Sequence, residues 1–170
     1  TFARVWHGDA ENDGFNRLVL AAGLHWRQVA MLRGYCKYLL QTGVPFSQAY
    51  VEGTFTRYPL LARLLVELFE ARFDPATGHE SKDAIAEGQA QLRAHLTVLA
   101  GGDEATLKVL KTVVDARKGD RTVQMDAARD ALLKLMDRVS SLDEDRILSS
   151  FMGVIYATLR TSYYLSHIHI

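Results

Sequence analysis

The chain has few cysteines, no net charge and no long apolar run. Its 170 residues include one cysteine and three prolines, and the formal net charge is zero. The single cysteine, Cys36, excludes an intrachain disulfide and is typical of a reducing compartment. A neutral chain has no strong field to attract nucleic acid, and no apolar run approaches the roughly 20 residues that cross a bilayer. We therefore expect a cytoplasmic protein whose partners include neither nucleic acid nor membrane.

Motifs for nucleotides and metals are also missing. The twelve glycines form neither a dinucleotide fingerprint nor a P-loop, both of which need a glycine-rich turn between a strand and a helix. The six histidines include no zinc-finger or HExxH spacing. The sequence therefore predicts no catalytic, cofactor-binding or metal-binding residue, and no cofactor held by this chain.

The sequence does contain apolar residues at helical spacing. In residues 12–75 apolar side chains recur every three or four positions, which predicts four helices. We expect the first to end at Gly23, the second to end at residues 42–45, the third to begin after Ser47, and the fourth to begin at Pro59.

The middle of the chain has a different pattern. Residues 79–139 carry thin apolar stripes and charged outer faces, which predicts an inserted helical hairpin that protrudes from the core. The pattern leaves open whether Gly119 and Asp120 divide this insert further. A last helix should follow Ser141, with Glu144 completing a capping box. Its predicted apolar face consists of Leu148, Phe151, Ile155, Leu159 and Tyr163.

These patterns together predict an all-α fold, a bundle of seven to eight helices with a protruding helical hairpin. We expect a single domain over residues 1–170, with its core formed by residues 12–75 and 140–164. Residues 165–170 form an unusual tail that could be non-native.

Several side chains could form a site, and each has a simpler structural interpretation. His167 and His169 could chelate a metal, but a solvent-exposed tail is the simpler interpretation. The acidic run Asp143-Glu144-Asp145 could hold a divalent cation, but acidic residues are also favoured in the first turn of a helix. Cys36 lies on an apolar stripe, which predicts burial rather than reactivity.

The first half of the chain is rich in aromatic residues with arginines nearby. These side chains could line a ligand groove, or they could anchor helix packing and domain contacts. The residues concerned are Trp6, Trp26, Tyr35, Tyr38, Tyr50, Tyr58, Arg17, Arg33 and Arg63.

Five strings of residues are more distinctive than helical periodicity requires. They are NDGFNRLV at 12–19, WRQVAMLR at 26–33, PFSQAY at 45–50, SLDEDRIL at 141–148 and ATLRT at 157–161. They resemble the large-subunit class of bacterial NAD-specific glutamate dehydrogenases. Within such an enzyme, this chain would correspond to a helical segment that precedes the catalytic domain. The segment between the strings looks longer than is usual in that family.

The resemblance implies an oxidoreductase whose whole polypeptide oxidises L-glutamate to 2-oxoglutarate and ammonia with NAD as cofactor. None of the family's catalytic or NAD-binding residues matches a position here, so this piece is expected to be inactive alone. The partners would be other domains or subunits of the same enzyme, in a homo-oligomer. Two alternatives are an allosteric module that binds an amino acid or nucleotide, and a free-standing adaptor that binds partner proteins through residues 79–139.

Overall fold

The computed structural model describes residue 7 and residues 11–165, and all regular structure in this part of the chain is helical. The expected all-α fold is therefore confirmed, with eight α-helices and one 3-10 helix among the described residues. In chain order they are η1 (Gly14–Arg17), α2 (Leu18–Ala21), α3 (Trp26–Gln41), α4 (Gln48–Arg57), α5 (Pro59–Phe73), α6 (Lys82–Ala100), α7 (Glu104–Ala116), α8 (Arg121–Met136) and α9 (Leu142–Ala157).

Local chemistry sets the helix boundaries in the first half of the chain. Gly23 has a φ of 62°, a left-handed conformation that glycine adopts without the steric cost of a Cβ. The Ser47 side chain accepts a hydrogen bond from the backbone N–H of Tyr50, and Pro59 occupies the first turn of α5. The predicted boundaries at these three residues are confirmed.

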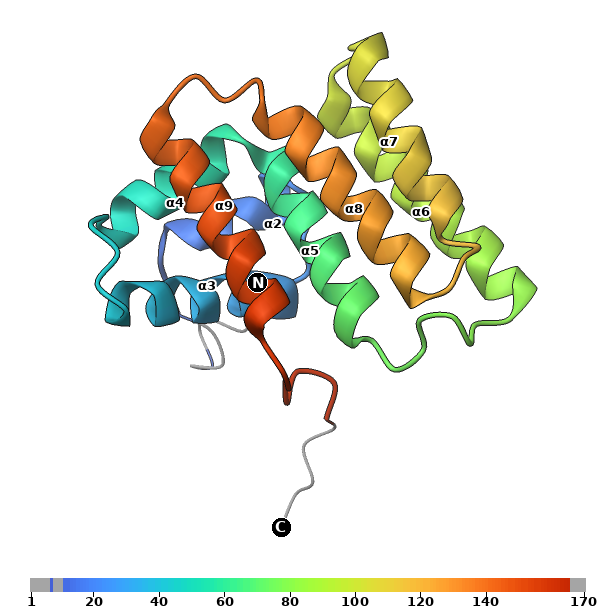
Figure 1. Cartoon of the computed structure of the whole chain (residues 1–170), viewed down its shortest axis with the longest axis horizontal. Coiled ribbons are helices and arrows are strands. Elements are labelled where there is room, and N and C mark those ends of the chain that lie inside the picture. The colour runs from blue at the N-terminus through green and yellow to red at the C-terminus, as the bar shows by residue number, and fades with distance from the viewer. Residues whose placement is uncertain (1–6, 8–10, 166–170) are drawn as a thin grey trace.

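Helix α5 lies in the middle of the molecule (Figure 1). Every residue from 61 to 69 is buried, because α5 contacts α2, α4, α6, α8 and α9. A helix covered on all sides can be apolar around its whole circumference. The neighbours lie on both sides of α5: α2, α3, α4 and α9 on one, and α6, α7 and α8 on the other (Figure 1).

The segment expected to be a protruding hairpin folds as three helices, and the third belongs to the core. Gly119 and Asp120 separate α7 from α8, and the Asp120 side chain caps α8 by accepting from the N–H of Val123. Ala128, Ala131 and Leu132 on α8 are at most 1% exposed and share one hydrophobic cluster with α5. Alanines let two helices approach closely, so a thin apolar stripe here marks tight packing and not an exposed arm.

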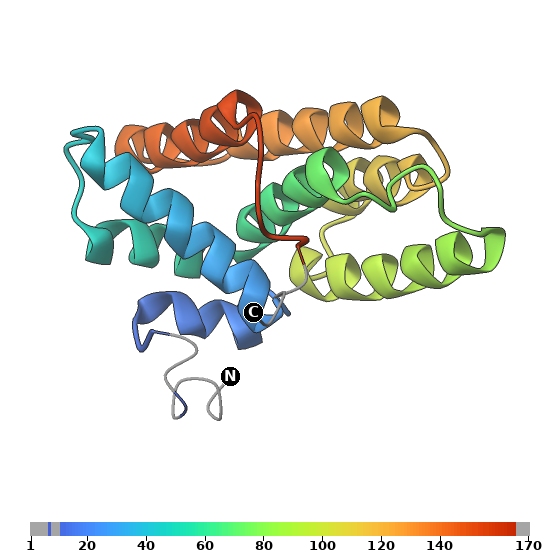
Figure 2. The ribbon, with the colours of Figure 1, turned by 90° about the horizontal axis from the view of Figure 1, so that it is seen from below.

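The last helix is shorter than its apolar pattern predicts. Leu148, Phe151 and Ile155 are fully buried, as expected. Leu159, predicted on the same face, is instead 88% exposed, because α9 ends at Ala157 and Thr158 is extended. The chain then leaves the helix axis and runs toward the start of α3 (Figure 2). None of the described helices combines the length and the apolar character needed to cross a membrane.

Candidate functional site

A groove of about 660 Å³ lies between α3 and the end of α9. Its aromatic walls come from α3, from the middle helix α5 and from the segment after α9. The aromatic residues that line it are Trp26, Tyr35, Tyr38, Phe69 and Tyr163. The groove thus gathers three of the aromatic residues singled out in the sequence, together with two others.

Polar contacts hold the segment after α9 against α3 and α5. The hydroxyl groups of Tyr35 and Thr158 are 3.1 Å apart, and Arg72 Nη2 donates to the carbonyl of Thr158 at 3.1 Å. Arg27 donates to the carbonyl of Tyr163, and its guanidinium carbon lies 5.0 Å from the centre of the Tyr163 ring. Hydrogen bonds and a cation–π contact between distant parts of the chain therefore hold the groove wall in place.

The charge of the groove is of one sign. Arg27 and Arg160 line it, and no aspartate or glutamate does. Both arginine residues are exposed. Burial raises the pKa of Tyr163 to about 12, so its hydroxyl stays neutral at physiological pH. The groove is an apolar surface with a cationic edge.

A smaller polar pocket of about 340 Å³ adjoins the groove, since Arg27 and Tyr163 line both. It contains Glu70, whose Oε1 accepts a hydrogen bond of 2.6 Å from Gln28 Nε2. Burial raises the pKa of Glu70 to about 7, and the neighbouring charge of Glu67 adds to the rise. Glu70 is therefore a carboxyl group that changes charge near neutral pH.

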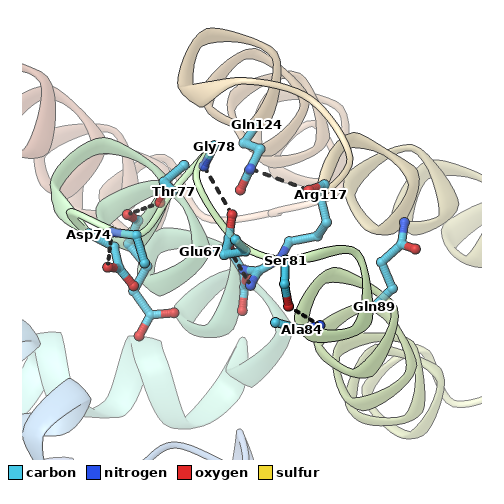
Figure 3. Close-up of polar contacts among 12 residues, drawn as sticks. Glu67, Asp74, Thr77, Gly78, Ser81, Ala84, Gln89, Arg117 and Gln124 are labelled. Carbon is cyan, nitrogen blue, oxygen red and sulfur yellow. Dashed lines mark hydrogen bonds and ion pairs between the residues drawn. The ribbon is translucent and has the colours of Figure 1, made fainter.

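Glu67 belongs to a buried charge network between α5 and the helices of the middle segment. Arg63 Nη2 lies 2.5 Å from Glu67 Oε1, and Arg117 Nη1 lies 3.7 Å from Glu67 Oε2. Arg117 also lies 3.7 Å from Glu80. Figure 3 shows Arg117, at the end of α7, and Gln124, on α8, beside the turn that joins α5 to α6. Buried charges in this arrangement neutralise one another, which indicates a structural role.

Arg33, one of the arginines singled out in the sequence, also has a structural role. It is 5% exposed and forms a bidentate pair with Asp13, with Nε–Oδ2 and Nη2–Oδ1 distances of 2.5 and 2.9 Å. Its Nη2 also donates to Asn16 Oδ1 at 3.1 Å. Two of the distinctive sequence strings are thus joined by one buried ion pair that fastens η1 to α3.

The acidic run at the start of α9 does not form a metal site. Asp143 and Asp145 are not fully buried, but Glu144 is only 2% exposed, and its carboxylate accepts hydrogen bonds from Arg57 and from the hydroxyl of Tyr58. The predicted capping box forms only in part, because Ser141 accepts from the Glu144 N–H while the Glu144 side chain turns to α4. In the part of the chain that the structure describes, no three His, Cys, Asp or Glu side chains gather to hold a metal ion.

The other candidates are scattered. Cys36 is fully buried, and burial raises the pKa of its thiol to about 11, which keeps it unreactive. Tyr50 stacks on Phe46 with ring centres 5.9 Å apart, away from the groove. Arg17 is exposed. Trp6, His167 and His169 lie outside the described residues.

Sequence reasoning missed the site around Glu70. The available signal was the presence of Glu67 and Glu70 within the apolar run of residues 60–73, where a charged side chain is costly unless it has a partner. The partners come from distant parts of the sequence: Gln28, which donates a hydrogen bond to Glu70, is 42 residues from it, and Arg117, which pairs with Glu67, is 50 residues from Glu67.

The described residues do not fit a nicotinamide dinucleotide. Such a cofactor is usually held by a glycine-rich turn between a strand and a helix, with its pyrophosphate at the helix N-terminus. Residues 11–165 contain no strand, and the left-handed glycines follow helices.

Comparison with known proteins gives two family matches. Residues 10–75 match the family described as glutamate dehydrogenase, helical motif 3, and residues 131–169 match the family described as bacterial NAD-glutamate dehydrogenase, catalytic domain. The first match covers η1 to α5, and the second covers the end of α8, all of α9 and the segment after it. No solved structure matches the chain.

Curated relatives match nearly the whole chain, including residues 79–139. The NAD-specific glutamate dehydrogenase of Halomonas elongata is 37% identical over 96% of this chain, and that of Mycobacterium tuberculosis is 37% identical over 95%. The enzyme of Pseudomonas aeruginosa is 34% identical over 96%. The chain spans about 8% of the length of each of these relatives.

The fold and these matches together define a helical segment of a large oxidoreductase family. More specifically, the chain belongs to the bacterial NAD-specific glutamate dehydrogenases, in the region where helical motif 3 is followed by the part matched to the catalytic domain.

Proposed function

We propose that the chain is a non-catalytic helical contact domain of an NAD-specific glutamate dehydrogenase. The complete polypeptide would oxidise L-glutamate to 2-oxoglutarate and ammonia, with NAD as the hydride acceptor. This segment would position and assemble other domains or subunits, in a homo-oligomeric cytoplasmic enzyme.

One observation carries this proposal: the four buried charged side chains among the described residues, Arg33, Arg63, Glu67 and Glu144, each have an ionic partner, and none of them lines the groove or the polar pocket beside it. Arg33 pairs with Asp13, Glu67 with Arg63 and Arg117, and Glu144 with Arg57. A catalytic site needs groups that converge on a reacting atom. These pairs instead join one helix to another or stabilise a single helix, as expected of a scaffold.

The purified chain should therefore produce no NADH from L-glutamate and NAD⁺. An assay over a range of glutamate concentrations tests this, with a full-length NAD-specific glutamate dehydrogenase as the positive control. Saturable, glutamate-dependent NADH formation by the chain alone would refute the proposal.

A second candidate function is an allosteric module, favoured by the groove in which Trp26, Tyr35 and Tyr38 lie near Arg27 and Arg160. Aromatic faces and a cationic edge suit an amino acid or a nucleotide. Calorimetric titration of the chain with each class separates the two functions. Saturable heat that is lost in Arg160→Ala would support the allosteric module, and its absence would support the contact domain.

A further inference from the structure

We propose that the groove between α3 and the end of α9 is a docking surface for an apolar segment that carries a carboxylate, from another region of the same polypeptide. This inference rests on the proposed contact function and names the surface that performs it.

The exposed apolar groups at the groove are the first reason. Tyr38 is 53% exposed and lines the groove, and Leu159 is 88% exposed between the lining residues Thr158 and Arg160. Leu159 is not itself a lining residue, but an apolar hollow with an exposed aromatic side chain at its wall is typical of contact surfaces. The groove has room for several side chains of a partner.

The groove is also preformed. Tyr35 and Phe69 pack edge to face with ring centres 6.0 Å apart, and Phe69 packs in the same manner on Tyr163 at 5.2 Å. The hydroxyl contact between Tyr35 and Thr158 fixes the opposite wall. A surface held rigid before binding loses little conformational entropy when it is covered.

Charge complementarity indicates the chemistry of the occupant. Arg27 and Arg160 line the groove without any carboxylate among the lining residues. A carboxylate on the partner would pair with one of these guanidinium groups at the edge, while its apolar neighbours cover Tyr38 and Met31. A basic or wholly apolar segment would leave Arg160 without a counter-charge in the groove, whereas Arg27 also lines the adjoining pocket that contains Glu70.

The position of the groove indicates where the occupant comes from. One wall, α3 and Phe69, lies in the part matched to helical motif 3, and the other wall lies in the part matched to the catalytic domain. The groove therefore follows the seam between two regions of the family. The chain spans only about 8% of its relatives, so the remaining polypeptide offers ample sequence to fill it.

Photo-cross-linking in the complete polypeptide that carries this chain tests the inference. Tyr38 is replaced by p-benzoyl-phenylalanine, and a matched probe replaces Val98, which is 80% exposed on α6. After irradiation, mass spectrometry identifies the captured segment. The probe at Tyr38 should capture a segment outside residues 1–170 that contains apolar residues and at least one aspartate or glutamate.

Charge reversal provides a second, independent readout. Arg160→Glu should lower the cross-linking yield at Tyr38 at least severalfold, whereas Lys108→Glu, an exposed change on α7, should leave it unaltered. Arg160 is exposed, so the variant is expected to fold, and circular dichroism checks this. An unchanged yield in Arg160→Glu would overturn the electrostatic part of the inference.

The outcomes also separate the inference from the contact function. Mixing isotopically heavy and light polypeptides shows whether the captured segment belongs to the same polypeptide or to a second copy, and capture of a second copy overturns the inference. If Tyr38 captures nothing while Val98 captures another region, the docking surface is refuted and the contact function stands. If neither probe captures anything, the docking surface is refuted, and association of the chain with the rest of the enzyme in trans then decides whether the contact function stands.

Discussion

At the scale of single residues, one buried and one half-buried carboxylate, Glu144 and Glu70, show how this fold accommodates charge. Glu144 is 2% exposed and accepts hydrogen bonds from Arg57 and Tyr58, and Glu70 is held by Gln28. The two differ in their partners: Glu144 contacts a cation directly, whereas the hydrogen-bond partner of Glu70 is a neutral amide. Burial without a cation in direct contact makes the protonated form of Glu70 more favourable.

Glu144→Gln should destabilise the protein by about 1–3 kcal/mol, because it weakens a charge-assisted pair that joins α9 to α4. Asp143→Asn is the matched control, since it neutralises an exposed carboxylate in the same turn and should cost less than about 0.5 kcal/mol. Urea denaturation measures both. If the two variants lowered the free energy of unfolding equally, the contacts of Glu144 with Arg57 and Tyr58 would add nothing to stability beyond the negative charge at the start of α9.

Glu70 should make stability depend on pH. Its pKa rises from 4.5 to about 7 on folding, so the folded state binds the proton more tightly than the unfolded state does. The stabilisation is fully present below pH 4.5 and is lost as the pH rises through 7, by an amount on the order of 2–3 kcal/mol at most.

Glu70→Gln should therefore flatten the pH dependence of unfolding across this range and raise stability at pH 8. The groups that face Glu70 are Glu67, Gln28, Arg63 and Arg117, and all are unchanged in this variant. Glu87→Gln, which alters an exposed carboxylate on α6, is the control and should follow the original chain. A Glu70→Gln curve parallel to that of the original chain would contradict this assignment.

At the scale of helices, the contact between α5 and α8 joins the two halves of the molecule. Arg121, the first residue of α8, donates to the carbonyl of Asp74 at 2.8 Å, to that of Ala71 at 3.2 Å and to that of Arg72. These carbonyls lie at the end of α5, where backbone groups lack partners within the helix. One side chain thus caps α5 and fixes where α8 begins.

Arg121→Met should cost about 1.5–3 kcal/mol, because it keeps the length of the side chain but leaves the carbonyls at the end of α5 without a charged donor. Lys118→Met, at an exposed position before α8, should change stability by less than about 0.5 kcal/mol. Thermal or urea unfolding measures both variants. If Arg121→Met were as stable as Lys118→Met, the hydrogen bonds from Arg121 to the end of α5 would make no net contribution to stability.

Helix boundaries were predictable where a single residue decides the backbone conformation, as at Gly23, Ser47 and Pro59. The packing partner of α8 was not, because Ala128 and Ala131 show a narrow stripe that could face either solvent or a close neighbour. Leu159 was misplaced for a related reason: periodicity continues past Ala157, but the backbone leaves the helix there. The groove depends on contacts between residues such as Tyr35 and Thr158, which are 123 positions apart in the chain.

At the scale of the whole molecule, the described residues form one hydrophobic cluster that includes η1 to α5, the three helices of the middle segment and α9. The match to helical motif 3 and the match to the catalytic domain both contribute to this cluster. Under the proposed contact function, the surface of this single unit would hold other parts of the polypeptide in place.

The most direct test of that role is association in trans. A polypeptide that carries the rest of the enzyme but lacks residues 1–170 is mixed with the purified chain, and the mass of the product is measured by analytical ultracentrifugation. The account predicts a stoichiometric complex whose formation is weakened by Arg160→Glu and not by Lys108→Glu. Two species that sediment independently at all concentrations would contradict it.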